Sequence, residues 1–179
     1  MNDTTTRTFL QIDLQNIFFE ARKRDEKIDF EKILEILNSR ETEYLTEAVV
    51  YLIRSQDFDS EKFENKLSSW GYKIQAKNAY RFIKDGRPYY KQTNLDVEIA
   101  VDCLKKLEGF DKLILMSGDG DFAYLCKHVQ QLGKTVEIWS FKECYNHNLE
   151  PDKINFITEE LFYKKPRVKI FDFKWGPQI

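Results

Sequence analysis

The chain has 179 residues, 42% of them hydrophobic, which suits one well-packed domain and is too little for two large ones. Its formal charge of −2 excludes the overall positive field of proteins that coat nucleic acids. No apolar run approaches the roughly 18 residues of a membrane span, and the first seven residues lack the apolar core of a signal peptide. A cytosolic protein without membrane contact is therefore expected.

Apolar runs and helical stripes alternate along the first half of the chain. A strand is predicted at 8–13, and then Leu14, Ile17, Phe18 and Ala21 recur at helical spacing. A second helix is predicted to begin after Asp29 as its N-cap. The run 48–53 is apolar without alternation, as in a strand covered on both faces. A third helix, with Phe63, Leu67 and Trp70 on one side, is predicted to end before Gly71.

The second half continues the pattern. A strand is predicted at 72–76, and an Asp-Gly pair within 84–88 predicts a turn, as at the tip of a hairpin. A helix from Asp96, a strand at 112–116, a helix that stops before Gly133 and a fifth strand at 135–140 complete the series. Strands separated by helices predict an α/β fold, a three-layer α/β/α sandwich with a mostly parallel central sheet.

The cysteines and histidines predict no zinc site. The three cysteines lie far apart without a CxxC pair, and Cys103 and Cys126 fall on helical apolar stripes, which favours buried thiols. His128 and His147 are the only histidines, and neither belongs to a pair at ligand spacing.

Carboxylates are the candidate functional groups. In Ser117-Gly-Asp-Gly-Asp-Phe122, two acids follow a predicted strand and precede a helix. Like charges this close are costly unless a cation or proton joins them, and a hard divalent metal suits oxygen ligands. Asp13 ends the first strand, and ligands of parallel sheets bind beyond the carboxyl ends of the strands. The helical count places Asp96 on the inward face of its helix and Asp102 roughly 130° from that face, as a rim or solvent residue.

Each of these residues also has a purely structural interpretation. Asp96 and Asp121 could be helix N-caps, and Asp13 could be an ordinary acid in a strand-to-helix turn. Ser117-Gly118 could be turn chemistry alone. Gly118 and Gly120 are expected to supply backbone freedom, because no P-loop lysine pattern accompanies them. Each signal is weak alone, and their convergence on one sheet edge favours a site.

Three blocks in order resemble the signatures of NYN-domain proteins, and most closely the LabA/DUF88 group of the PIN-like nucleases. They are Asp13-Leu-Gln-Asn16, Asp96-Val-Glu-Ile-Ala-Val-Asp102 and Ser117–Phe122, and the likeness covers about residues 8 to 140. The resemblance implies a PIN-like fold and a metal-dependent ribonuclease site. It implies that Asp13, Asp96, Asp119 and Asp121 are the metal-binding acids. By the same resemblance, Asn16 is the polar residue after the first acid, Ser117 the small hydroxyl before the acidic pair, and Asp102 a family aspartate.

The expected chemistry follows from charge. Bound Mg²⁺ or Mn²⁺ neutralises a phosphodiester and activates water, and four acids could hold one metal or two. Asp13, Asp96 and Asp119 are assigned as primary ligands, and Asp121 as a ligand that acts directly or through water. Asn16 and Ser117 are expected to position the phosphate or a water molecule held by the metal.

Cations mixed with aromatic residues are candidates for substrate contact. They lie in Arg22-Lys-Arg24 and in 80–91, as Arg22, Arg81, Lys84, Arg87 and Lys91. A solvated helix end and an ordinary aromatic hairpin remain the alternative. The family often places a lysine close before the central aspartate, whereas Lys91 precedes Asp96 by four intervening residues.

Residues 1–163 are assigned to the nuclease domain and 164–179 to a basic, aromatic tail. The tail could extend an RNA path or dock on a partner protein, and its aromatic residues are expected to pack on the body or at a homo-oligomer interface. The predicted function is a metal-dependent endoribonuclease acting on single-stranded or structured RNA. The alternatives are a regulatory RNA-binding module that cleaves weakly or not at all, and a metal-dependent phosphohydrolase acting on DNA or a small phosphorylated molecule.

Overall fold

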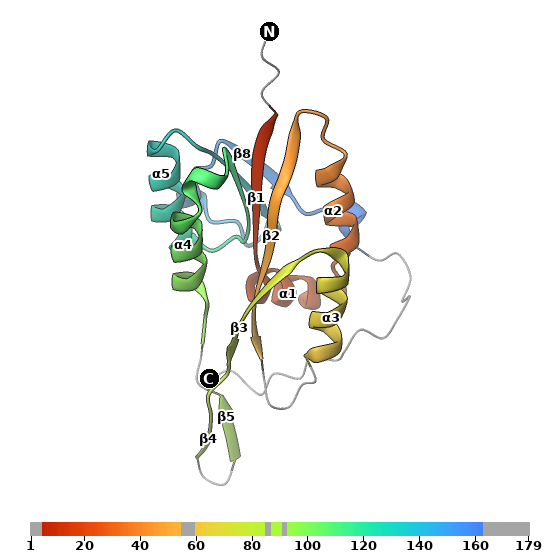
Figure 1. Ribbon diagram of the computed structural model, residues 1–179. Helices are drawn as coiled ribbons and strands as arrows, with labels where there is room; N and C mark the ends of the chain where they lie inside the picture. The colour runs from red at the N-terminus through yellow and green to blue at the C-terminus, as the bar shows by residue number, and fades with distance from the viewer. Residues whose placement is uncertain (1–4, 55–59, 85–86, 91–92, 163–179) are drawn as a thin grey trace.

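A six-stranded parallel sheet forms the centre of the protein (Figure 1). We describe a computed structural model, in which residues 5–54, 60–84, 87–90 and 93–162 are described. The strands are β1 (Thr6–Asp13), β2 (Glu43–Arg54), β3 (Lys73–Asn78), β6 (Lys112–Met116), β7 (Thr135–Ser140) and β8 (Lys153–Phe156). Their order is β3-β2-β1-β6-β7-β8, and each neighbouring pair is parallel. The predicted α/β fold with a mostly parallel sheet is confirmed.

Helices cover both faces of this sheet. Three lie on one face, namely α1 (Leu14–Lys23), α2 (Phe30–Asn38) and α3 (Glu61–Trp70). Two lie on the other face, namely α4 (Asp96–Lys105) and α5 (Ala123–Gln131). Short 3₁₀ turns complete the body, namely η1 (Leu107–Gly109), η2 (Gly120–Phe122), η3 (His147–Leu149) and η4 (Glu159–Leu161).

The two cores follow from the alternation of side chains along each strand. Leu10 and Ile12 of β1 point into the core beneath α1–α3, whereas Phe9 points into the core beneath α4 and α5. By the same alternation, Gln11 and Asp13 face the α4 and α5 side. Asp13 therefore reaches the carboxyl end of β1 on the same side as the helix that carries Asp96.

Several local predictions are confirmed. The Asp29 side chain caps α2 by accepting a hydrogen bond from the Lys32 amide at 3.0 Å. Gly71 ends α3 with φ of 105°, a conformation that glycine adopts without strain. Cys103 and Cys126 are buried in the core beneath α4 and α5, and burial raises the pKa of each thiol to about 12.

Two features correct the prediction from sequence. A sixth strand, β8, extends the sheet beyond β7, and it escaped prediction because an edge strand of four mostly exposed residues lacks a long apolar run. The strand predicted at 72–76 lies slightly later, as Lys73–Asn78. The predicted tail, residues 164–179, lies outside the described residues.

A hairpin stands apart from the body. Strands β4 (Arg81–Lys84) and β5 (Arg87–Tyr90) pair antiparallel, which confirms the predicted hairpin. It projects past the carboxyl ends of the parallel strands (Figure 1). Within the described ranges, every helix is too short or too polar to cross a membrane.

Candidate metal centre

The strand order reverses between β1 and β6, which lie side by side at the middle of the sheet. At such a switch point the loops after the two strands diverge and leave a crevice, where ligands of open parallel sheets bind. Asp13 is the last residue of β1, and Ser117 directly follows β6. The N-terminus of α4 brings Asp96 to the same edge.

Three carboxylates meet in this crevice. One oxygen from each of Asp96, Asp119 and Asp121 lies within 4.8 Å of the other two. Asp96 and Asp119 are half-buried and Asp121 is exposed, so the cluster opens to solvent on one side. Burial, followed by the charges of Asp119 and Asp121, raises the pKa of Asp96. The structure thus brings together three of the four predicted acids around one point.

Asp13 lies behind this cluster and is held by both of its oxygens. Oδ1 accepts from the Asn16 amide at 3.3 Å, and Oδ2 accepts from the Ser117 hydroxyl at 3.1 Å. Burial, with a smaller contribution from the charges of Asp96 and Asp119, raises the pKa of Asp13 to about 6, although both hydrogen bonds act to lower it. The charges of the cluster therefore act on Asp13, although Asp13 is not one of the three carboxylates whose oxygens lie within 4.8 Å of one another.

The predicted capping roles fall on different residues from those expected. Asp119, not Asp121, caps the turn after β6, because its Oδ1 accepts from the Asp121 amide at 3.0 Å. The N-cap of α4 is Leu95, so Asp96 is the first helical residue and does not act as the cap. The Asp96 carboxylate instead accepts a hydrogen bond from Asn94, a residue that the sequence analysis missed. The one sequence signal for Asn94 was its amide side chain, two positions before Asp96.

Gly118 and Gly120 are needed for close approach, which corrects the expectation of backbone freedom. Positive φ among the described glycines occurs at Gly71 and Gly133 only. A Cβ on Gly118 would lie 2.5 Å from the Cys144 carbonyl oxygen and from the Ser140 hydroxyl. A Cβ on Gly120 would lie 2.3 Å from the Asn146 side chain. The acidic turn therefore packs directly on the loop that follows β7.

Asn16 and Ser117 hold the centre together. The Asn16 side-chain oxygen Oδ1 accepts from the Gly118 amide at 3.0 Å, which ties α1 to the acidic turn. The Ser117 hydroxyl, fully buried, donates to Asp13 and accepts from the Asp119 amide at 3.2 Å. Both predicted substrate-positioning residues thus fix the positions of the acids.

Asp102 is not one of the three clustered carboxylates. It accepts a hydrogen bond at 3.2 Å from the hydroxyl of Tyr51, which in turn accepts from Gln11 at 2.7 Å. This chain joins α4 to β2 and β1 in the interior, so Asp102 is half-buried and anchored to Tyr51 and is not a solvent residue of the rim. Its contact supports the helix that presents Asp96.

The predicted cations lie at two places. Arg22 is exposed in the last turn of α1, and its neighbour Arg24 pairs with Glu143 at 2.5 Å and stacks on Phe141. Arg81, Lys84 and Arg87 belong to the hairpin strands β4 and β5. Lys91 lies outside the described residues. The hairpin stands at the same end of the sheet as the acids (Figure 1).

The donor set fits a hard divalent cation. Three carboxylate oxygens converge, and within the described part of the chain no lysine or arginine forms an ion pair with them. Mg²⁺ takes a few carboxylates and keeps several waters, which suits a cluster open on one side. Burial first, and then the charges of Asp119 and Asp121, raise the pKa of Asp96, and a bound cation would offset the repulsion among these three charges.

Comparison with known proteins shows the family and the fold of the chain. The chain is 31% identical over 119 residues to the low amplitude and bright protein LabA of Synechococcus elongatus, covering 65% of this chain and 64% of that protein, so less than two thirds of the relative is matched. A crystal structure of a protein of unknown function from Vibrio parahaemolyticus superposes with a TM-score of 0.77 at 23% identity. That match covers 91% of this chain and 99% of the other, and it shows a shared fold. The NYN domain model matches residues 7–158, and the chain therefore belongs to the NYN-domain family, within the PIN-like superfamily.

Proposed function

We propose that the protein is a metal-dependent endoribonuclease that hydrolyses RNA phosphodiester bonds at the acidic cluster with Mg²⁺ or Mn²⁺. One observation carries the proposal, namely the convergence of Asp96, Asp119 and Asp121 to within 4.8 Å at the switch point of a nuclease-like fold. A protein that only bound a polyanion would gain nothing from a concentration of negative charge in this crevice. A regulatory module without cleavage is therefore the weaker hypothesis.

The residues divide into ligands and supports. Asp96, Asp119 and Asp121 would hold the cation, and Asp13 adds a fourth acid directly behind them. When bound, the cation would neutralise the phosphate and lower the pKa of attacking water. Asn16 and Ser117 keep the acids in position, because they link Asp13, Gly118 and Asp119 through hydrogen bonds that are buried or partly buried. Such supports commonly change metal affinity or activity 10- to 100-fold when they are removed.

The first test is cleavage of end-labelled RNA and of DNA of the same sequence, with Mn²⁺, Mg²⁺ or EDTA. Asp119→Asn is the main variant, because asparagine can still accept from the Asp121 amide while removing the charge. We expect metal-dependent RNA cutting that this variant loses by more than about 100-fold. Asp25→Asn is the matched control, since Asp25 is exposed with φ of 55°, which asparagine tolerates.

A thermal-shift measurement separates metal binding from catalysis. Mn²⁺ at about 100 times its dissociation constant should stabilise the wild type by about 2.7 kcal/mol, and Asp119→Asn should lose this shift. Equal cutting by wild type and Asp119→Asn would reveal a contaminating nuclease. RNA binding without cutting would favour the regulatory module, and cutting of DNA alone would favour the other phosphohydrolase.

A further inference from the structure

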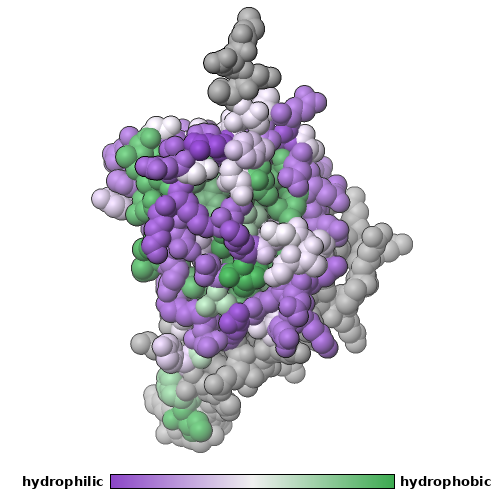
Figure 2. All heavy atoms as spheres, in the orientation of Figure 1, coloured by the Kyte–Doolittle hydropathy of each residue, from purple (hydrophilic) through white to green (hydrophobic). Residues whose placement is uncertain are grey.

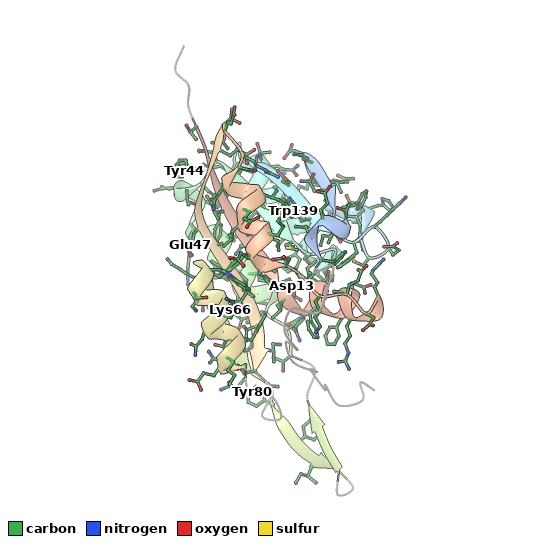
Figure 3. The ribbon with its side chains drawn as sticks, turned by 90° about the vertical axis from the view of Figure 1, so that its right-hand side faces the viewer. Asp13, Tyr44, Glu47, Lys66, Tyr80 and Trp139 are labelled. Carbon is green, nitrogen blue, oxygen red and sulfur yellow. The ribbon has the colours of Figure 1, made fainter. Side chains whose placement is uncertain are left out.

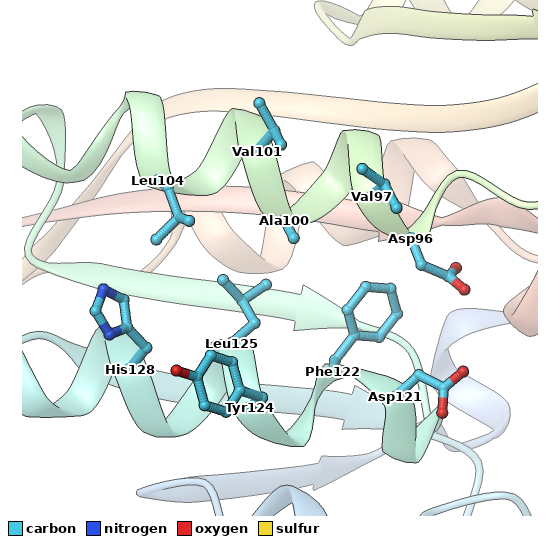
Figure 4. A pocket seen from close by; sticks show the side chains of 10 residues that line it. All are labelled: Asp96, Val97, Ala100, Val101, Leu104, Asp121, Phe122, Tyr124, Leu125 and His128. Atoms are coloured by element: carbon cyan, nitrogen blue, oxygen red, sulfur yellow. The ribbon is translucent and has the colours of Figure 1, made fainter.

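A groove runs away from the acidic cluster between α4 and the segment formed by η2 and α5 (Figure 4). Its volume is about 300 Å³. Val97, Val101 and Leu104 line it from α4, and they recur at helical spacing on a stripe that the sheet does not cover. Figure 2 shows apolar side chains among polar ones over this side of the molecule.

The groove and the cluster are continuous. Asp96 and Asp121 line one end of the groove and also belong to the three acids that meet at one point. Figure 4 shows both carboxylates at that end, with the apolar side chains following along the two helices. A molecule lying in the groove would therefore be adjacent to a phosphate placed at the cluster.

The chemistry of the lining selects a neutral, flat group. The lining residues that the structure describes include two carboxylates and no lysine or arginine, so an anionic phosphate would be repelled from the groove. Tyr124 presents an aromatic ring that is 82% exposed, although the adjoining Phe122 and Leu125 are buried. His128 adds a ring that can donate or accept a hydrogen bond. An aromatic face beside a polar ring suits a nucleobase, which stacks by its π-face and bonds by its edge.

Size favours the same occupant. The groove's volume of about 300 Å³ lies at the lower end of the range for pockets that hold small ligands, which is enough for one base. We propose that this groove binds an unpaired nucleobase of the RNA strand, stacked on Tyr124, next to the phosphate held at the acidic cluster. The inference rests on the proposed function, and it makes unpaired RNA the substrate class.

Equilibrium binding tests the groove separately from cleavage. A short fluorescein-labelled single-stranded RNA is titrated with the full chain in Ca²⁺, and binding is followed by fluorescence anisotropy. Tyr124→Ala should weaken binding about 5- to 150-fold, the range that loss of one stacked base gives, and Tyr124→Phe should stay within about twofold of wild type. Tyr44→Ala is the matched control, because Tyr44 is 48% exposed and lies toward the opposite end of the sheet from Asp13 (Figure 3).

Abasic RNA identifies the contact. Replacing single bases by abasic sites should find one position that weakens wild-type binding by the same factor, and Tyr124→Ala should add nothing there. Val101→Trp, which fills the groove from α4, should weaken binding as Tyr124→Ala does. Equal binding by Tyr124→Ala and Tyr44→Ala would overturn the inference, as would wild-type RNA binding too weak to measure.

The two proposals can fail separately. RNA binding that depends on Tyr124 without any metal-dependent cleavage would retain the groove assignment and reject the nuclease. Cleavage that is normal in Tyr124→Ala, with normal affinity, would retain the nuclease and reject the groove assignment. A wild-type dimer in sedimentation that Val101→Trp converts to monomer, with unchanged RNA affinity, would assign the groove to a second copy of the chain instead.

Discussion

Asp13 illustrates how a single residue can be costly for folding and still be suited to a site. It is 8% exposed and accepts two hydrogen bonds, and yet burial raises its pKa to about 6. A carboxyl in the unfolded chain has a pKa of about 3.9. The folded chain therefore binds this proton more tightly, and stability is lost as the pH rises from about 4 through 6.

We expect Asp13→Asn to stabilise the metal-free protein at pH 8. The amide can accept from the Asn16 backbone and carries no charge, so the variant should gain about 1–3 kcal/mol in the free energy of unfolding. The gain should vanish below about pH 4, where Asp13 is protonated in both states. Urea unfolding in EDTA at several pH values measures this difference.

Asp25→Asn provides the control for a general change in net charge. Asp25 is exposed, so its substitution removes one negative charge without disturbing the interior. A less stable Asp13→Asn at pH 8 would show that the hydrogen bonds of Asp13 outweigh its burial. Asp13→Asn should also lose Mn²⁺-dependent stabilisation if the fourth acid contributes to the site.

At the level of elements, the fold could largely be predicted because periodicity reports which face of a segment is buried. A short or exposed segment has too few buried residues to show a periodicity. Strand β8, with most of its four residues exposed, was missed for that reason. The acids could be placed at one edge because they follow strand ends and helix starts. The separation of Asp13 from the other three acids could not be predicted. It depends on the hydrogen bonds that the Asn16 amide and the Ser117 hydroxyl donate to the two oxygens of Asp13.

Contacts between distant segments were also beyond a single sequence. Asp102 was placed near solvent by its helical count, because the count cannot include Tyr51, which reaches it from β2. Tyr124 had a usable signal, since it is an aromatic residue off the buried stripe of α5, but that pattern did not reveal the groove that Tyr124 lines. From the sequence, Gly118 and Gly120 were expected to supply backbone freedom, because the sequence does not show that the loop after β7 packs against them.

Gly118→Ala should separate the acidic turn from that loop. Its new methyl group would meet the Cys144 carbonyl and the Ser140 hydroxyl at 2.5 Å, and the carbonyl belongs to the backbone and cannot rotate away. We expect a loss of about 1–3 kcal/mol in stability, as for other overpacked sites. The Mn²⁺-induced thermal shift should shrink as well, because the turn carries Asp119.

Gly109→Ala is the matched control. A Cβ there would meet nothing within 4 Å, and Gly109 does not have positive φ. Its stability should therefore stay within about 0.5 kcal/mol of wild type. Equal thermal shifts for the two alanine variants would show that close approach at Gly118 does not position the acids.

Across the whole molecule, the two ends of the sheet carry different groups of charged residues. The carboxyl end carries the acidic cluster, whereas a buried ion-pair network lies toward the amino end. Its centre is Glu137 of β7, fully buried, which accepts from Arg40 at 2.7 and 3.0 Å and from Trp139 at 2.7 Å. Lys112 of β6 lies 3.5 Å from the same carboxylate. The network joins the end of α2 to the centre of the sheet, and Figure 3 shows Trp139 and Asp13 at separate heights.

Glu137→Gln should lower stability without affecting metal binding. Burial alone would raise the pKa of Glu137, but hydrogen bonds from Arg40 and Trp139 outweigh it and the pKa is lowered. Breaking such a pair leaves Arg40 without its buried partner and should cost about 3–5 kcal/mol. Because the folded pKa is depressed, this stabilisation exists above pH 4.3 or so and is lost on acidification, so the difference from wild type should narrow at low pH.

Chemical unfolding and Mn²⁺ thermal shifts measured on the same variant test this separation. Glu143→Gln is the control, because Glu143 is exposed and its pair with Arg24 should contribute little to stability. If Glu137→Gln also lost the Mn²⁺ shift while still folded, the amino-end network would have to position the acids through β6 and β7. An unchanged shift in a destabilised protein would establish that the acidic cluster depends on its own local supports, Asn16, Ser117 and the two packed glycines.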